Sequence, residues 1–221
     1  RDMIAAHDMF RREFGLTPGL IRSTAVGDLA RASAVADHLV LMIRILHLHH
    51  AEEDRLLWPK LHARAPRDLA GVVTLMQNHH ERIHYLTDST QALLPHWRSY
   101  ARTEDRDRIT AVLDQLNLVL NEHLNAEEQH ILPLVRRCLT AAEWRQLGED
   151  SLAALPTRQL PLVFGMVNYE ADPEVISSML AAAPLLPRLL MPILGPRAYA
   201  RYARRLYGTS KPGGPSMQVS T

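Results

Sequence analysis

The feature that most constrains this chain is a short pattern that occurs twice, at residues 49–59 and again 74 positions later at residues 123–133. In each copy a histidine precedes a glutamate by four residues, and apolar residues and a proline follow. On an α-helix, residues four apart lie on one face, about 6 Å apart along the axis. Each copy therefore directs an imidazole and a carboxylate to one point, which predicts a metal site where two such helices meet. The repeated residues are His49, Glu53 and Pro59 in the first copy, and His123, Glu127 and Pro133 in the second.

Apolar residues recur at helical spacing along four stretches of the chain, and the alternation typical of strands is weak. Four helices joined by short or moderate connections predict an all-α fold, an up-down four-helix bundle with short additional C-terminal helices. The repeat predicts two similar helical hairpins related by a pseudo-twofold axis. Pro18 and its flanking glycines are expected to interrupt the first helix, and residues 98–107 to form a polar connection. The expected helices span residues 2–24, 28–63, 68–96 and 108–139.

The pattern changes after residue 139. Thr140-x-x-Glu143 has the form of a capping box and predicts the start of a short helix. Frequent prolines then divide the chain into short helical pieces. We expect a bundle over residues 1–140, a helical extension packed on it over residues 141–209, and a disordered tail over residues 210–221.

Composition narrows the classes of function. A net charge of +1 and an aromatic content of 5% argue against a nucleic-acid-binding surface. The single cysteine, Cys138, excludes an intrachain disulfide, which favours a reducing, cytoplasmic location. No apolar run is long enough to predict an integral membrane segment. Twelve histidines are unusually many for a chain of 221 residues.

The third predicted helix adds His80 and His84, four residues apart on one face, and the first adds His7. Together with the repeat, they give five histidines and two glutamates, which exceeds the four ligands of one tetrahedral zinc ion. A single His-x-x-x-Glu pair is usually a solvated contact, but ligands repeated on several core-forming helices favour two metal ions bridged by the glutamates. The candidate ligands are His7, His49, Glu53, His80, His84, His123 and Glu127.

This combination resembles the hemerythrin-like, or HHE cation-binding, family of non-haem di-iron four-helix bundles. The resemblance covers about residues 1–140 and implies two iron ions in an oxo- or hydroxo-bridged centre. His80, His84 and His123 would hold one iron, and His7 and His49 the other. Glu53 and Glu127 would bridge the two.

The resemblance also implies a coordination position left open on the second iron. Dioxygen, nitric oxide or peroxide could bind there, in sensing, storage or stress protection. The alternative is an enzyme that uses the same site to decompose peroxide, reduce nitric oxide or oxidise a small substrate. The sequence does not decide between binding and catalysis, and it identifies no protein partner.

The family's oxygen carriers place an aspartate five residues after the last histidine, whereas Glu127 and Glu128 occupy positions four and five here. The register with Glu53 favours Glu127, and a local helix distortion would favour Glu128. His50 and His79 flank predicted ligands and are expected to point away from the site, toward solvent or against a ligand, and His47 is expected at the surface. A basic helical segment, residues 197–205, is expected to be a solvated face or a weak contact with a partner or membrane surface.

Overall fold

The computed structural model describes residues 1–64, 66 and 70–213. These residues are helical or lie in short connections and contain no strand, which confirms the all-α prediction. The chain divides into a central unit, Ile21–Leu155, and a terminal unit, Arg1–Leu20 with Pro156–Thr221. This division differs from the predicted boundary at residue 140, because the first helix groups with the C-terminal helices. Residues 214–221 of the predicted tail lie outside the described part of the chain.

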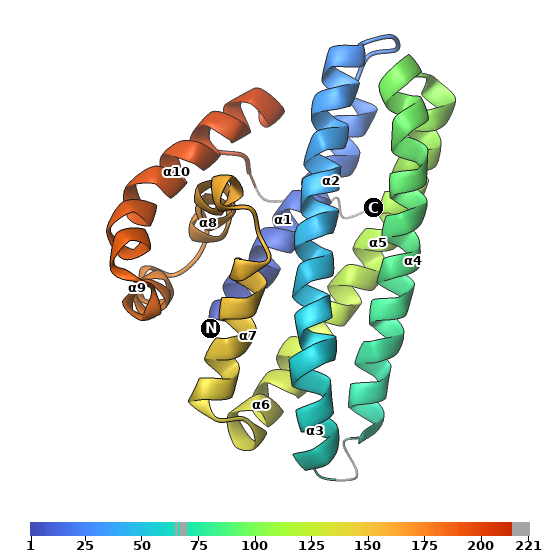
Figure 1. Ribbon diagram of the computed structural model, residues 1–221. Helices are drawn as coiled ribbons and strands as arrows, with labels where there is room; N and C mark the ends of the chain where they lie inside the picture. Colours follow the sequence, from blue (N-terminus) through green and yellow to red (C-terminus); the bar gives the residue numbers. More distant parts are fainter. Residues whose placement is uncertain (65, 67–69, 214–221) are drawn as a thin grey trace. The chain divides into compact units, whose positions relative to one another are not determined.

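In the central unit, α4 packs against both α2 and α5, and the three helices run alongside one another (Figure 1). Two π-helical turns, η1 and η3, interrupt the long helices at the repeated pattern. None of the helices that the structure describes has both the length and the hydrophobicity needed to cross a bilayer. The elements are α2 (Leu29–Glu52), η1 (Glu53–Leu57), α3 (Trp58–Arg64), α4 (Ala70–Tyr100), α5 (Thr103–Ala126), η3 (Glu127–Ile131), α6 (Leu132–Cys138) and α7 (Ala141–Ala153).

Two predicted interruptions are wrong. The first helix, α1 (Asp2–Arg22), continues through Pro18, because burial of apolar side chains such as Phe14 outweighs the single backbone donor that proline lacks. The expected polar connection at residues 98–107 is largely helical, and only residues 101–102 separate α4 from α5. Acidic side chains in the first turn of α5 favour the helix there, although they carry no apolar period.

The two π-helical turns begin at equivalent positions of the repeat. The Trp58 N–H donates to the Glu53 carbonyl, five residues back, and the Leu132 N–H donates to the Glu127 carbonyl in the same way. A proline follows each turn, and because it has no N–H it cannot continue the regular bonding pattern. The repeat therefore encodes a widened helical turn at each glutamate as well as a histidine–glutamate pair.

Two residues that lie just beyond the two copies, at the same 74-residue separation, also contact each other. The Arg64 guanidinium donates to the Cys138 carbonyl at 3.0 Å, and the Cys138 thiol lies 3.8 Å from the Arg64 carbonyl. Such reciprocal contacts between residues 74 positions apart are what a twofold axis produces. Apolar side chains in and just after both copies form one core with Val73 and Met76 of α4, and these side chains are Leu57, Trp58, Leu61, Ile131, Leu134 and Val135.

The terminal unit also contains α8 (Leu160–Asn168), α9 (Pro173–Ala182) and α10 (Leu185–Tyr207), and a buried carboxylate on α1 joins this helix to α10. Glu13 accepts hydrogen bonds from the hydroxyls of Tyr199 at 2.7 Å and Tyr207 at 2.5 Å. Arg12 donates to Glu13 at 3.0 Å and to the Met166 carbonyl at 2.8 Å. Burial raises the pKa of both tyrosines, so they remain protonated donors.

Helices α8 and α10 approach each other at Gly165. A Cβ atom at Gly165 would lie 2.2 Å from the Gly195 carbonyl oxygen and 2.9 Å from the Tyr199 Cβ. The first of these is a backbone atom, which cannot move without displacing α10. α10 is longer than the short pieces expected from sequence, because Pro192 and Pro196 lie inside a continuous helix.

We expect Gly165→Ala to destabilise the terminal unit by about 1–3 kcal/mol, the usual range for overpacking. Gly148→Ala on α7 is the matched control, because nothing lies within 4 Å of the added Cβ. That variant should be neutral or more stable by up to about 1 kcal/mol, since alanine favours helices. Urea unfolding followed by circular dichroism measures both, and equal stability of the two variants would contradict the close approach.

Candidate metal centre

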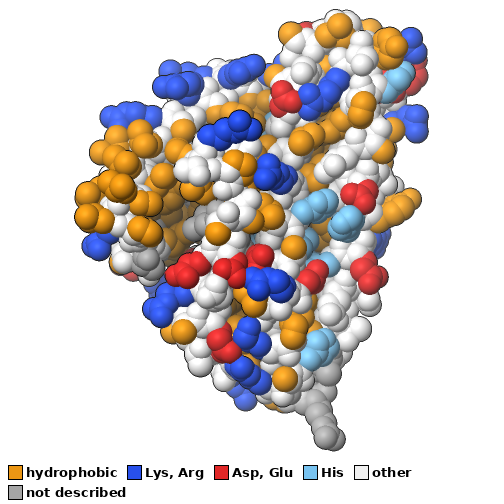
Figure 2. Space-filling view, in the orientation of Figure 1, with side chains coloured by type: hydrophobic (Ala, Val, Ile, Leu, Met, Phe, Trp, Pro, Cys, Tyr) orange, Lys and Arg blue, Asp and Glu red, His pale blue; other side chains and the backbone are white. Residues whose placement is uncertain are grey.

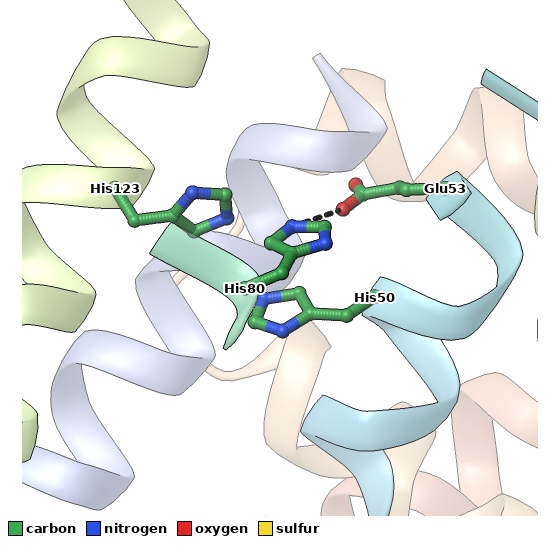
Figure 3. A group of neighbouring side chains, drawn as sticks. All are labelled: His50, Glu53, His80 and His123. Atoms are coloured by element: carbon green, nitrogen blue, oxygen red, sulfur yellow. Dashed lines mark ion pairs between the residues drawn. The ribbon is translucent and has the colours of Figure 1, made fainter. Parts of the chain in front are cut away.

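Three histidines and one glutamate converge in the interior of the central unit. His50 and Glu53 come from α2 and η1, His80 from α4, and His123 from α5 (Figure 3). One ligand atom from each of these residues lies within 4.8 Å of all the others. All four side chains are buried, which separates this group from the exposed acidic clusters common on protein surfaces.

The geometry around His80 fixes the direction of its ring. The His80 Nε2 lies 3.5 Å from a Glu53 carboxylate oxygen, the ion pair dashed in Figure 3. On the other side of the ring, Nδ1 lies 2.8 Å from an Asp54 carboxylate oxygen. The His50 ring stacks on that of His80 with centroids 3.9 Å apart. A carboxylate on the outer nitrogen of a histidine is the usual device for aiming the other nitrogen at a metal.

Local structure explains why these residues meet. His50 and Glu53 are three positions apart, so they share a face of the helix at the point where α2 passes into η1. Trp58, at the end of the widened turn, is buried and lies 5.6 Å from the His80 ring, centroid to centroid. The π-helical turn thus places Glu53 inward and covers it with the apolar core that follows.

The surroundings favour a neutral imidazole at His50 and a positively charged one at His80. Burial, together with the neighbouring His80 and His123, holds the pKa of His50 well below its ordinary value of 6.5. Burial also disfavours the charged form of His80, but Asp54 and Glu53 outweigh it and raise its pKa to about 9. The two carboxylates therefore stabilise a positive charge at the position of His80 Nε2.

The donor set fits a metal cation. Three imidazoles and a carboxylate suit iron, zinc or copper better than calcium or magnesium, which prefer oxygen ligands. The buried His50 Nε2 has no hydrogen-bond partner among the described residues, and such an atom is costly unless it binds a ligand. The arrangement could hold one metal ion directly.

A second histidine–glutamate pair adjoins this group. The His49 Nε2 lies 3.3 Å from the Glu53 carboxylate, and the His123 Nε2 lies 3.8 Å from the Glu127 carboxylate. Ligand atoms of His49 and Glu127 lie within 4.8 Å of each other. Both copies of the repeat therefore place their histidine beside their glutamate. Glu127 is fully buried whereas Glu128 is partly exposed.

His84, grouped with His80 in the sequence prediction, does not join the buried group. Its side chain is 63% exposed, and its Nδ1 lies 3.0 Å from an Asp88 carboxylate oxygen. Four residues advance a helix by about 6 Å, so His84 lies a full turn beyond the level of His80. In the buried group, His50 lies beside His80 in place of His84.

His7 lies on α1 in the terminal unit, and its role as a ligand stays a prediction from sequence. His50 and Asp54 are the residues that sequence reasoning undervalued. The alignment of the two copies of the repeat pointed to His49. Spacing alone could not show which side of α2 faces α4, and that side carries His50. The signal for Asp54 was its position next to Glu53, facing the histidines of the following helix.

Comparison with known protein families matches residues 1–135 to the hemerythrin HHE cation-binding domain. The chain belongs to this family. Neither the curated proteins nor the solved structures gave a significant match. Membership confirms the resemblance drawn from the motifs, and this HHE domain carries a buried His/Glu group that fits the cation its family binds.

We expect His50→Ala to lower the metal content of the purified chain, because it removes a buried nitrogen donor. His130→Ala is the matched control, since His130 is an exposed histidine on η3. Elemental analysis measures the metal, and circular dichroism checks that both variants remain folded. Equal metal content in two folded variants would exclude His50 as a ligand.

Proposed function

We propose that this chain holds a non-haem di-iron centre that binds dioxygen, or a related small ligand such as nitric oxide or peroxide. The observation that carries the proposal is the position of Glu53 between two sets of donors. One of its oxygens lies 3.3 Å from His49 and the other 3.5 Å from His80. A carboxylate with one oxygen toward each set could bridge two metal ions, which supports the proposal.

His50, His80 and His123 would hold one iron with Glu53. His49 and Glu127 would hold the other, with His7 as the further ligand expected from sequence. The second set has fewer protein donors, which leaves coordination positions for a small ligand. Bound iron would supply redox and Lewis-acid chemistry there.

The chain's own residues would control that centre. Asp54 orients His80 through the 2.8 Å contact with Nδ1. Leu57, Trp58 and Ile131 are fully buried in the core that follows the two π-helical turns, and they keep the neighbouring interior dry. A cytoplasmic role in sensing, storage or stress protection is part of the proposal.

Metal analysis and optical spectra of the freshly purified chain, with and without azide, test the proposal. We expect about two irons per chain and absorption bands that azide changes, since both follow from an open di-iron site. One zinc ion and a featureless spectrum would refute it. Stoichiometric uptake of nitric oxide or peroxide by the reduced protein would indicate binding, whereas repeated turnover would indicate an enzyme.

Glu53→Gln provides a sharper test of the bridge. Loss of a bridging carboxylate should remove both metal ions together, whereas loss of a ligand to one ion should remove mainly that ion. Glu52→Gln is the control, because the Glu52 carboxylate lies on the neighbouring face and accepts from Arg55 at 3.0 Å. If Glu53→Gln retains two metals per chain, Glu53 does not bridge.

A further inference from the structure

A second group of metal-binding side chains lies at the surface of the central unit. Ligand atoms of His47, His84 and Asp88 all lie within 4.8 Å of one another. The His47 and His84 rings stack with centroids 4.7 Å apart and an interplanar angle of 8°. Thr87 holds His47 through a 2.8 Å contact between its hydroxyl and Nε2. Figure 2 shows histidine side chains at the surface over α2 and α4.

The surface group continues the buried one along the same two helices. His47 precedes His50 by three residues on α2, and His84 follows His80 by four residues on α4. His47 stacks on His84 and His50 stacks on His80, so these four rings form two levels about one helical turn apart. The outer level reaches solvent, whereas the inner level belongs to the candidate metal centre.

We propose that His47, His84 and Asp88 bind a divalent transition-metal ion at the surface, and that this ion supplies the buried centre. Two imidazoles and one carboxylate suit iron, zinc or cobalt, and three protein ligands leave room for the waters of an incoming hydrated ion. Exposure of His84 and Asp88 makes the site exchangeable. The supply step rests on the proposed function, but surface binding does not.

Calorimetric titration of the metal-loaded full chain with Co²⁺ tests surface binding. We expect one weak additional site, whose affinity falls about tenfold or more in His84→Ala, as loss of a contact at a metal site commonly causes. His62→Ala is the control, because His62 is an exposed histidine on α3. His123→Ala should keep the surface site while losing metal from the centre. No additional site in the wild type, or equal affinity in His84→Ala, would overturn the proposal.

The rate of iron uptake by the metal-free chain tests the supply step. His84→Ala should reach the same final metal content as the wild type, but more slowly. An unchanged rate would overturn supply through this site. An unchanged final metal content also distinguishes the surface site from the proposed centre, because loss of a ligand of the centre would lower the final metal content.

A different observation concerns the first half of α10 in the terminal unit. Six large apolar side chains there are between 42% and 70% exposed, and apolar side chains gather over this helix in Figure 2. They recur at helical spacing, so they form one stripe along the exposed side. The six are Leu185, Leu186, Leu189, Leu190, Ile193 and Leu194.

All charged side chains in α10 and in the residues around it are basic. Residues 175–221 contain five arginines and one lysine and no acidic residue. Arg197, Arg201 and Arg204 line a shallow hollow just beyond the apolar stripe. An exposed apolar stripe that runs into a row of arginines matches the layers of an anionic membrane surface, where apolar side chains enter the acyl boundary and arginines meet phosphates.

We infer that α10 binds the surface of membranes that contain anionic phospholipids. Co-sedimentation of the full chain with phosphatidylserine-containing vesicles should show binding that pure phosphatidylcholine vesicles do not give and that salt weakens. Leu189→Glu and Arg201→Gln should each reduce it. Leu118→Glu on α5 is the control, because Leu118 is 69% exposed outside this surface.

Two outcomes would overturn the inference. One is equal binding by Leu189→Glu and Leu118→Glu. The other is a concentration-dependent dimer, abolished by Leu189→Glu, in a chain that does not bind vesicles. The dimer would assign the stripe to a second copy of the chain. Gel filtration at several protein concentrations measures that outcome directly.

Discussion

The central unit depends on how it accommodates a carboxylate in its interior. Glu53 is fully buried, and removing its charge from water is costly unless other groups stabilise it. Imidazoles from two helices, His49 and His80, lie within 3.5 Å of its oxygens. A cation at this point would complete the compensation, as the metal site that we propose requires.

The π-helical turns link that requirement to the sequence repeat. Each begins at a glutamate and precedes a proline, so the widened turn and the ligand occupy fixed positions relative to each other. The apolar residues that follow, such as Trp58 and Leu134, come together in one core. Arg64 and Cys138 contact each other reciprocally beyond it. The buried glutamate, the helical distortion and the start of the core are therefore encoded together, twice, in about eleven residues.

The histidines of α2 and α4 show how far helical spacing can specify a site. Spacing placed His80 and His84 on one face, and both do lie on the side of α4 that faces α2. It could not specify the level along the axis at which the interior closes to solvent. That level separates a buried ring at His80 from an exposed ring at His84. Only the packing of neighbouring helices decides it.

The sequence by itself determined the all-α class, the repeat and the pairing of each histidine with its glutamate, because these follow from residues close together on one helix. Local geometry is nearly independent of the rest of the chain. The tertiary structure decided which neighbour of His49 faces α4, brought Asp54 to His80, and carried α10 through its prolines. Those outcomes depend on contacts between segments far apart in the sequence, where burial outweighs local preference.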